Sequence, residues 1–115
     1  MSFEVNESKT YEQTFETVRT AALGAIAGLE GKVVKQSDGR IEAKFDKKIL
    51  GKVLGDRTQI EIDLSAPATN ASQVDVVVYP LDPVGRKLMF GARKGVSQTV
   101  ASWFWAHLEH RLPKE

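Results

Sequence analysis

The middle of the chain, from Val33 to Tyr79, consists of segments in which apolar and polar residues alternate. Alternation with a period of two is typical of β-strands that bury one face and expose the other. The dipeptide Asp38-Gly39 interrupts this series and is typical of a two-residue hairpin turn with positive φ. Because strands joined by such turns pair antiparallel, the pattern predicts an antiparallel sheet with one apolar face.

The strands expected in this block are 33–37, 40–46, 58–64 and 74–79, with a possible short edge strand at 86–90. A two-residue turn places Val34 directly opposite Ala43 in the neighbouring strand. We therefore expect Val34 to be buried on the same face as Ile41 and Ala43.

Segments with helical periodicity precede and follow these strands in the chain. Apolar residues recur every three or four positions over 11–29, after a short first strand at 3–5, and Ser8 is the expected helix cap. A second stripe of this kind runs over 96–112 and ends before Pro113. Each helix needs an apolar surface on which to pack, and the sheet offers one.

The order strand, helix, four or five antiparallel strands, helix predicts an α+β fold, a two-layer sandwich with both helices on one face of the sheet. The 115 residues are the length of one domain, so 1–115 is expected to be a single α+β domain. The order resembles a shortened helix-grip domain of the polyketide-cyclase and lipid-transfer kind, or a TATA-protein-type repeat. No residue motif of either family is present, so the resemblance assigns no functional residue.

Composition excludes several classes of protein. The chain has no cysteine, which excludes a disulfide framework, a thiolate nucleophile and a Cys-ligated metal centre. A net charge of +1 is far from that of a dedicated nucleic-acid-binding protein. No apolar run approaches the roughly 20 residues of a transmembrane segment, and no secretory signal is visible. We expect a cytoplasmic protein.

Motifs for catalysis are missing from the sequence, which contains no GxSxG, P-loop or GxGxxG pattern. His107 and His110 are three residues apart on the second helix, but a zinc site needs at least three protein ligands. Glu61 and Asp63 are expected on the outer face of a strand, where nothing raises a carboxylate pKa. We therefore expect no catalytic residue, no metal and no cofactor, and an enzyme of unrecognised type is the less favoured alternative.

Two segments mix basic and apolar residues: 46–56, which reads DKKILGKVLGD, and 85–95, which reads GRKLMFGARKG. Their basic residues are Lys47, Lys48, Lys52, Arg86, Lys87, Arg93 and Lys94. Such mixtures are typical of surfaces that bind anionic groups, membrane surfaces or acidic partners. Alternatively, the apolar residues cover the edge of a small core and the lysines keep it soluble.

The apolar candidates for an interaction surface are Leu88, Met89, Phe90 and Trp105. Trp103, Phe104 and Trp105 point to different sides of the second helix, so only two of them can face the sheet. We expect Trp105 to point elsewhere, either against a neighbouring loop or outward as an anchor for a partner.

Strand directions predict that segment 46–56 and the segment after Tyr79 leave the sheet at the same end, with Asp38-Gly39 at the opposite end. Segment 91–95 precedes the second helix, whose first N–H groups have no intrahelical partner. Together with Arg93 and Lys94, these groups predict an anion site, unless Ser97 or water satisfies the donors.

These observations predict a small non-catalytic binding or adaptor domain of unknown specificity, which binds a small apolar or anionic ligand near loops 46–56 and 80–95. The alternative is a protein-interaction or oligomerisation domain that uses the same apolar and basic surface. A pocket between helix and sheet favours the first function, and a filled core favours the second.

Overall fold

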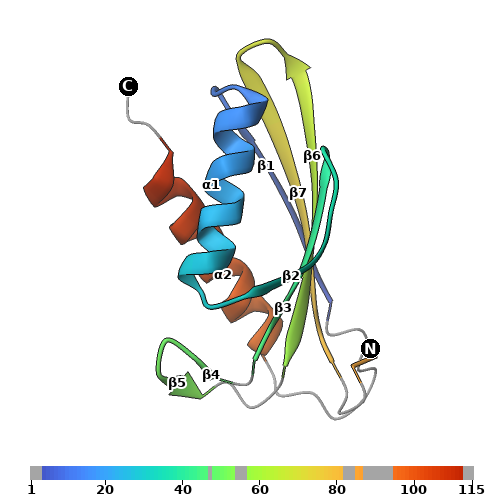
Figure 1. The fold of residues 1–115 in the computed structure, drawn as a ribbon, viewed down its shortest axis with the longest axis vertical. Helices are drawn as coiled ribbons and strands as arrows, with labels where there is room; N and C mark the ends of the chain where they lie inside the picture. Colours follow the sequence, from blue (N-terminus) through green and yellow to red (C-terminus); the bar gives the residue numbers. More distant parts are fainter. Residues whose placement is uncertain (1–3, 47, 54–56, 82–84, 87–94, 113–115) are drawn as a thin grey trace.

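A computed structural model describes residues 4–46, 48–53, 57–81, 85–86 and 95–112. Its elements are β1 (Val5–Tyr11), α1 (Phe15–Gly28), β2 (Lys32–Gln36), β3 (Arg40–Phe45), β4 (Lys48–Ile49), β5 (Lys52–Val53), β6 (Thr58–Ala68), β7 (Ala71–Pro80) and α2 (Val96–Arg111). Five strands form an antiparallel sheet in the order β1-β7-β6-β3-β2, and β4 and β5 form a separate hairpin. Both helices cover one face of the sheet (Figure 1), which confirms the predicted α+β sandwich.

The first helix begins later than the sequence suggested. We expected Ser8 to cap it, which is wrong, because β1 continues through Ser8 to Tyr11 and pairs with β7 along this length. The helix begins at Phe15, and the hydroxyl of Thr14 accepts a hydrogen bond from the N–H of Thr17. Tyr11 lies four residues before Phe15, so it extends the helical apolar stripe without belonging to the helix.

The predicted register of β2 is correct beside the turn, where Gln36 pairs with Ile41, but wrong at Val34. A β-bulge separates Val33 from Lys35, so Val33 rather than Val34 pairs with Ala43. The Val34 side chain is consequently 47% exposed instead of buried. A bulge adds one unpaired residue to an edge strand and, with the lysines beside it, discourages pairing with another chain.

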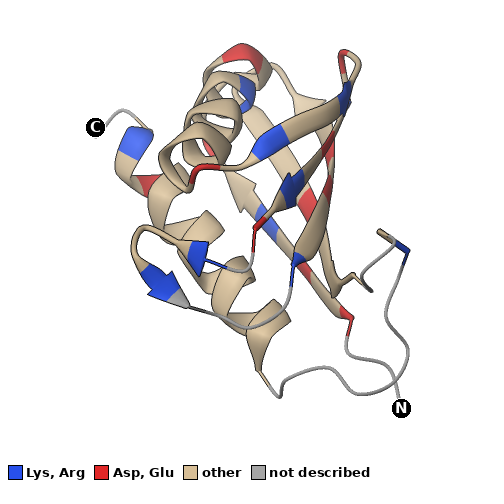
Figure 2. Ribbon diagram, turned by 60° about the horizontal axis from the view of Figure 1, so that its bottom comes forward, with Lys and Arg blue, Asp and Glu red and all other residues tan. Residues whose placement is uncertain are grey.

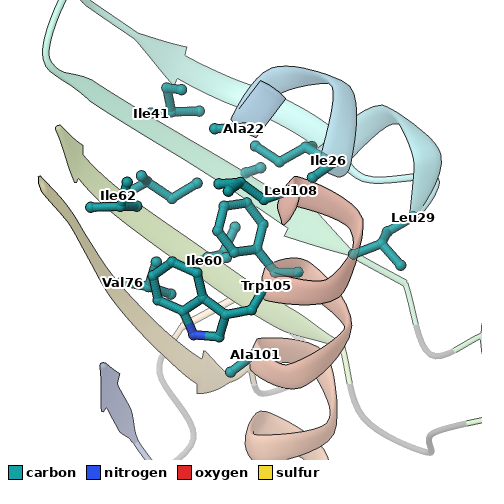
Figure 3. Packing of buried hydrophobic residues seen from close by; sticks show 14 of the residues in the cluster. Ala22, Ile26, Leu29, Ile41, Ile60, Ile62, Val76, Ala101, Trp105 and Leu108 are labelled. Carbon is teal, nitrogen blue, oxygen red and sulfur yellow. The ribbon is translucent and has the colours of Figure 1, made fainter. Parts of the chain in front are cut away.

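The core lies between the helices and the sheet. Figure 3 shows α2 placing Trp105 and Leu108 over Ile60, Ile62 and Val76 of the sheet, with Ala22 and Ile26 of α1 beside them. All of these side chains are almost completely buried. The middle of the helix–sheet interface is therefore filled with side chains over its described length.

The directions of the strands agree with the prediction. Phe45 pairs with Thr58, and Thr58 also pairs with Pro80, so β3, β6 and β7 meet at one end of the sheet. The Asp38-Gly39 turn lies at the other end, where the Gly39 carbonyl accepts a hydrogen bond from the N–H of Leu64. We call the first of these ends, where α2 also begins, the loop end (Figure 1).

Candidate ligand-binding surface

Of the basic residues predicted for the site, the structure describes Lys48, Lys52 and Arg86, and all three lie at the loop end. The other predicted site residues, Lys47, Lys87, Leu88, Met89, Phe90, Arg93 and Lys94, lie outside the described residues, as does most of the possible edge strand 86–90. Lys48 and Lys52 belong to the β4–β5 hairpin, which lies on the helix side of the sheet (Figure 1). Gly85, next to Arg86, lies near the Lys44 ammonium on the uncovered face. The described basic residues thus share one end of the sheet but lie on two sides of it.

The β4–β5 hairpin is held against the core and against the residues that follow α1. Ile49 is buried in the core, and the Leu50 N–H donates a 2.7 Å hydrogen bond to Glu30 Oε1. Leu50 and Gly51 form the turn, with φ of 50° and 82°. Two positive φ angles are what a type I′ hairpin turn requires. The Leu50 side chain projects into solvent and is 56% exposed.

Lys52 connects this hairpin to α2. Its ammonium lies 5.6 Å from the centre of the Trp103 ring, within the range of a cation–π interaction. Trp103 is partly buried against the core, so it presents only part of its ring at this side of the molecule. The hairpin and the outer face of α2 therefore form one continuous surface.

No side chain of the described residues caps the beginning of α2. Gly95 occupies the N-cap position with φ of 83°, and no side-chain hydrogen bond caps the helix there. The Thr99 hydroxyl donates to the Gly95 carbonyl, so it is turned away from the N–H groups of the first turn. The first turn contains no acidic residue. The three leading N–H groups of α2 have no intrahelical acceptor and carry the positive end of the helix dipole.

Among the described residues, two buried hydroxyl groups at the loop end have no hydrogen-bond partner. The Ser97 hydroxyl lies in the first turn of α2, where the residue is only 3% exposed. Thr58 is completely buried at the start of β6. A buried hydroxyl without a partner costs about 1–3 kcal/mol, so such groups normally meet water or a ligand.

The sequence contained a signal for both hydroxyl groups that we did not use. Ser97 precedes Ala101 and Phe104 on the apolar stripe of α2, with helical spacing. Thr58 precedes Ile60 on the inward positions of β6. The same periodicities that predict the core therefore also predict that these two polar groups are buried.

Trp105 packs in the core, so the expectation that it points away from the sheet, against a loop or outward, is wrong. It is 4% exposed, its indole N–H donates a 2.9 Å hydrogen bond to Glu7 Oε1, and its ring contacts Phe104 edge to face. The physical reason is the extra length of β1, which brings Glu7 and Tyr11 beside α2. Trp103, rather than Trp105, is the tryptophan that remains partly uncovered.

A polar cluster joins β1 to the last turns of α2. Glu109 accepts hydrogen bonds from the Tyr11 hydroxyl at 2.8 Å and the Lys9 ammonium at 3.1 Å, and Lys9 also lies over the Trp105 ring. The bond from Tyr11, assisted by Lys9, lowers the pKa of Glu109 against the effect of partial burial. Burial and the neighbouring Glu109 raise the pKa of Tyr11, so its phenol stays protonated at neutral pH. The cluster holds the fold together and leaves no group poised for proton transfer.

Replacing Glu109 by glutamine should remove part of the sensitivity of the fold to acid. Because the folded-state pKa of Glu109 lies below its ordinary value of 4.5, the ionised carboxylate stabilises the fold above that pH. This contribution is lost as the pH falls through the lower, folded-state pKa. Urea denaturation should show that the wild type has a higher free energy of unfolding than Glu109→Gln at neutral pH, and that this difference becomes smaller in acid. A difference that stays constant with pH would contradict the assignment.

The two histidines lie at the opposite end of α2 from Ser97. Arg111 packs over Gly24 of α1 and donates a 3.0 Å hydrogen bond to the carbonyl of His107. Burial is the largest cause that lowers the pKa of His107, and the charges of Arg111 and His110 lower it further. Among the residues that the structure describes, no group of three or more His, Asp or Glu side chains gathers to hold a metal ion.

The uncovered face of the sheet carries an ion-pair network. Arg40 forms salt bridges with Glu42, Glu61 and Asp63, and the Tyr79 hydroxyl donates a 2.6 Å hydrogen bond to Glu61. As predicted, Glu61 and Asp63 point outward, and here they neutralise an arginine. This pairing gives no acid–base site.

Comparison with known proteins adds information about the fold. No protein-family model matches the chain, and no curated protein matches its sequence. Among solved structures, the crystal structure of Ara h 8.0201 superposes with a TM-score of 0.56 and 12% sequence identity, over 94% of this chain and 96% of that chain. Ara h 8 is a Bet v 1-like protein with a helix-grip fold. The chain has this fold.

The resemblance to helix-grip domains, seen in the order of elements, is therefore confirmed at the level of architecture. An identity of 12% shows the fold alone, because one fold serves many unrelated functions. Among the described segments, neither helix is long and apolar enough to span a membrane.

Proposed function

We propose that this protein is a non-catalytic binding domain that takes a small anionic ligand with an apolar portion at the loop end, where α2 begins. One observation carries the proposal: the hydroxyl of Ser97 is buried in the first turn of α2, and within the described part of the chain it has no partner and the helix has no side-chain cap. A ligand carboxylate or phosphate can accept hydrogen bonds from this hydroxyl and from the leading N–H groups of α2.

The surroundings of Ser97 suit a ligand that is partly apolar. Val96, Val100 and Leu81 are buried at the loop end, and the unpartnered Thr58 hydroxyl belongs to the same end of the sheet. An apolar portion can contact these aliphatic side chains while the anionic group meets the start of the helix.

The basic residues predicted from the sequence supply the charge in this proposal. Arg93 and Lys94 precede Gly95, the N-cap residue of α2, in the chain, and we assign them to the anionic group of the ligand. Lys47, Lys87 and Arg86 are further candidates from the same segments. Exposed cations of this kind make binding sensitive to salt, because charges are screened over about 10 Å at 0.1 M ionic strength.

A binding role fits Ser97 better than a nucleophilic one. A serine nucleophile needs a base within hydrogen-bond reach, and no described residue gives the Ser97 hydroxyl such a partner. His107 lies ten residues farther along α2 (107 minus 97), which corresponds to about 15 Å of helix. The filled interface between helices and sheet speaks against a ligand held inside the fold and favours the alternative, a protein-interaction or oligomerisation domain, so the proposed ligand site lies at the loop end. Burial of Trp105 removes one of the two surfaces expected for that alternative, and the apolar and basic surface remains.

The test is an NMR titration of the protein with decyl phosphate and, separately, with inorganic phosphate, following the backbone N–H signals of residues 95–99. Ser97→Ala should weaken decyl phosphate binding about 10- to 100-fold, because a hydrogen bond to a charged group contributes about 1.5–3 kcal/mol. The same change should leave the stability of the free protein equal or slightly higher, because it removes an unpaired buried hydroxyl.

Two variants complete this experiment. Ser102→Ala changes an exposed serine of the same helix and should leave binding unchanged. The double variant Arg93→Gln, Lys94→Gln should bind more weakly and with less dependence on salt. If neither probe shifts the signals of 95–99, the proposed site does not exist.

A further inference from the structure

Leu50, at the tip of the β4–β5 hairpin, occupies a position that neither local geometry nor packing explains. Its φ of 50° lies in the left-handed region, which asparagine, aspartate and glycine adopt far more readily than leucine. Its side chain is also 56% exposed to water. A leucine at this position is unfavourable twice over, so its presence calls for a contact outside the described chain.

The hairpin holds this leucine in a defined place. Ile49 anchors one side of the turn in the core, and the bond from the Leu50 N–H to Glu30 fixes the tip against the end of α1. Lys52 is held over the Trp103 ring. The exposed side chain therefore projects from a fixed support.

Each face of the hairpin carries one lysine beside the tip. Lys48 pairs with Val53 and Ile49 pairs with Lys52, so the two lysines lie on opposite faces of the two-stranded ribbon. Figure 2 shows both strands of the hairpin carrying basic residues. The Glu30 carboxylate beside the tip accepts a hydrogen bond from the Leu50 backbone. An apolar tip between two cations complements a layered structure in which anionic groups cover an apolar interior.

We propose that the β4–β5 hairpin docks this domain on anionic lipid bilayers, with the Leu50 side chain entering the acyl region and Lys48 and Lys52 contacting lipid phosphates. A bilayer accepts a protruding side chain without a complementary pocket. A stable protein partner needs roughly 800 Å² on each side, far more than one projecting leucine provides. Among the described residues, the other exposed large apolar side chains are Val33 and Val34, which belong to β2.

The proposal is independent of the ligand site at the start of α2, because it uses different residues and a different kind of surface. Its test is co-sedimentation of the protein with vesicles of phosphatidylglycerol and phosphatidylcholine, compared with vesicles of phosphatidylcholine alone. The wild-type protein should bind the anionic vesicles preferentially, and its binding should weaken as salt increases.

Leu50→Asn is the decisive variant, because asparagine suits the left-handed conformation and should leave the fold as stable or more stable. Its affinity for anionic vesicles should fall about tenfold, since burial of the leucine side chain is lost. Replacing Lys48 and Lys52 together by glutamine should lower the affinity about fivefold for each lysine and flatten the salt dependence. Val34→Thr removes another exposed apolar side chain and should change nothing.

Three results would overturn the proposal. The first is equal vesicle binding by wild type and Leu50→Asn. The second is loss of vesicle binding in Ser97→Ala but not in Leu50→Asn, which would assign the membrane contact to the start of α2. The third is absence of vesicle binding together with self-association, measured by sedimentation velocity, that Leu50→Asn abolishes; the tip would then be a contact between copies of the chain.

Discussion

Trp105→Ala is expected to lower the free energy of unfolding by about 3–5 kcal/mol, the usual cost of truncating a buried aromatic side chain. The indole ring fills the space between α2 and the edge strand β1, and its N–H bonds Glu7. Removing it leaves a cavity, an unpaired Glu7 carboxylate and a Lys9 ammonium without its aromatic neighbour. Urea denaturation followed by circular dichroism measures the loss.

Trp103→Ala is the matched control, because Trp103 is a tryptophan of the same helix that is only partly buried. Its replacement should cost less than half as much, since less apolar surface returns to water. Equal losses for the two variants, or a larger loss for Trp103, would mean that Trp105 is not part of the core.

Gly31→Ala is expected to destabilise the fold by about 1–3 kcal/mol through overpacking. Gly31 lies between α1 and β2, and a Cβ atom there would lie 2.4 Å from Phe45 Cε1 and 2.8 Å from Ile26 Cγ2. Both neighbours are fully buried, so neither can move without disturbing the core. Thermal unfolding should show the loss as a lower midpoint.

Gly24→Ala should change the stability of the fold in the opposite direction. Its Cβ atom would meet only the flexible side chain of Arg111, which is exposed and can move aside. Alanine inside a helix is favoured over glycine by about 1 kcal/mol, so the variant should be slightly more stable than the wild type. Destabilisation of the same size in both variants would show that the crowding at Gly31 is not the cause.

The parts of the candidate site that follow from strand direction could be predicted, because antiparallel strands reverse at each turn. The loop end was correctly expected to gather the segments after Phe45 and Tyr79. The exposed Leu50 was not singled out, because Leu-Gly is a weak turn signal compared with Asn-Gly or Asp-Gly. The bulge at Val34 was missed because a single inserted residue leaves the alternation of its neighbours nearly intact.

The sequence by itself determined the two helices, the antiparallel strands and the layer that each apolar stripe would face, because these depend on periodicities within a few residues. Only the tertiary structure decided which of Trp103 and Trp105 is buried. That choice depends on β1, which lies beside α2 although the two are about a hundred residues apart in the chain. The position of the Ser97 hydroxyl, which finds no partner among the described residues, was decided in the same way, since hydrogen bonding of a buried group depends on the residues packed around it.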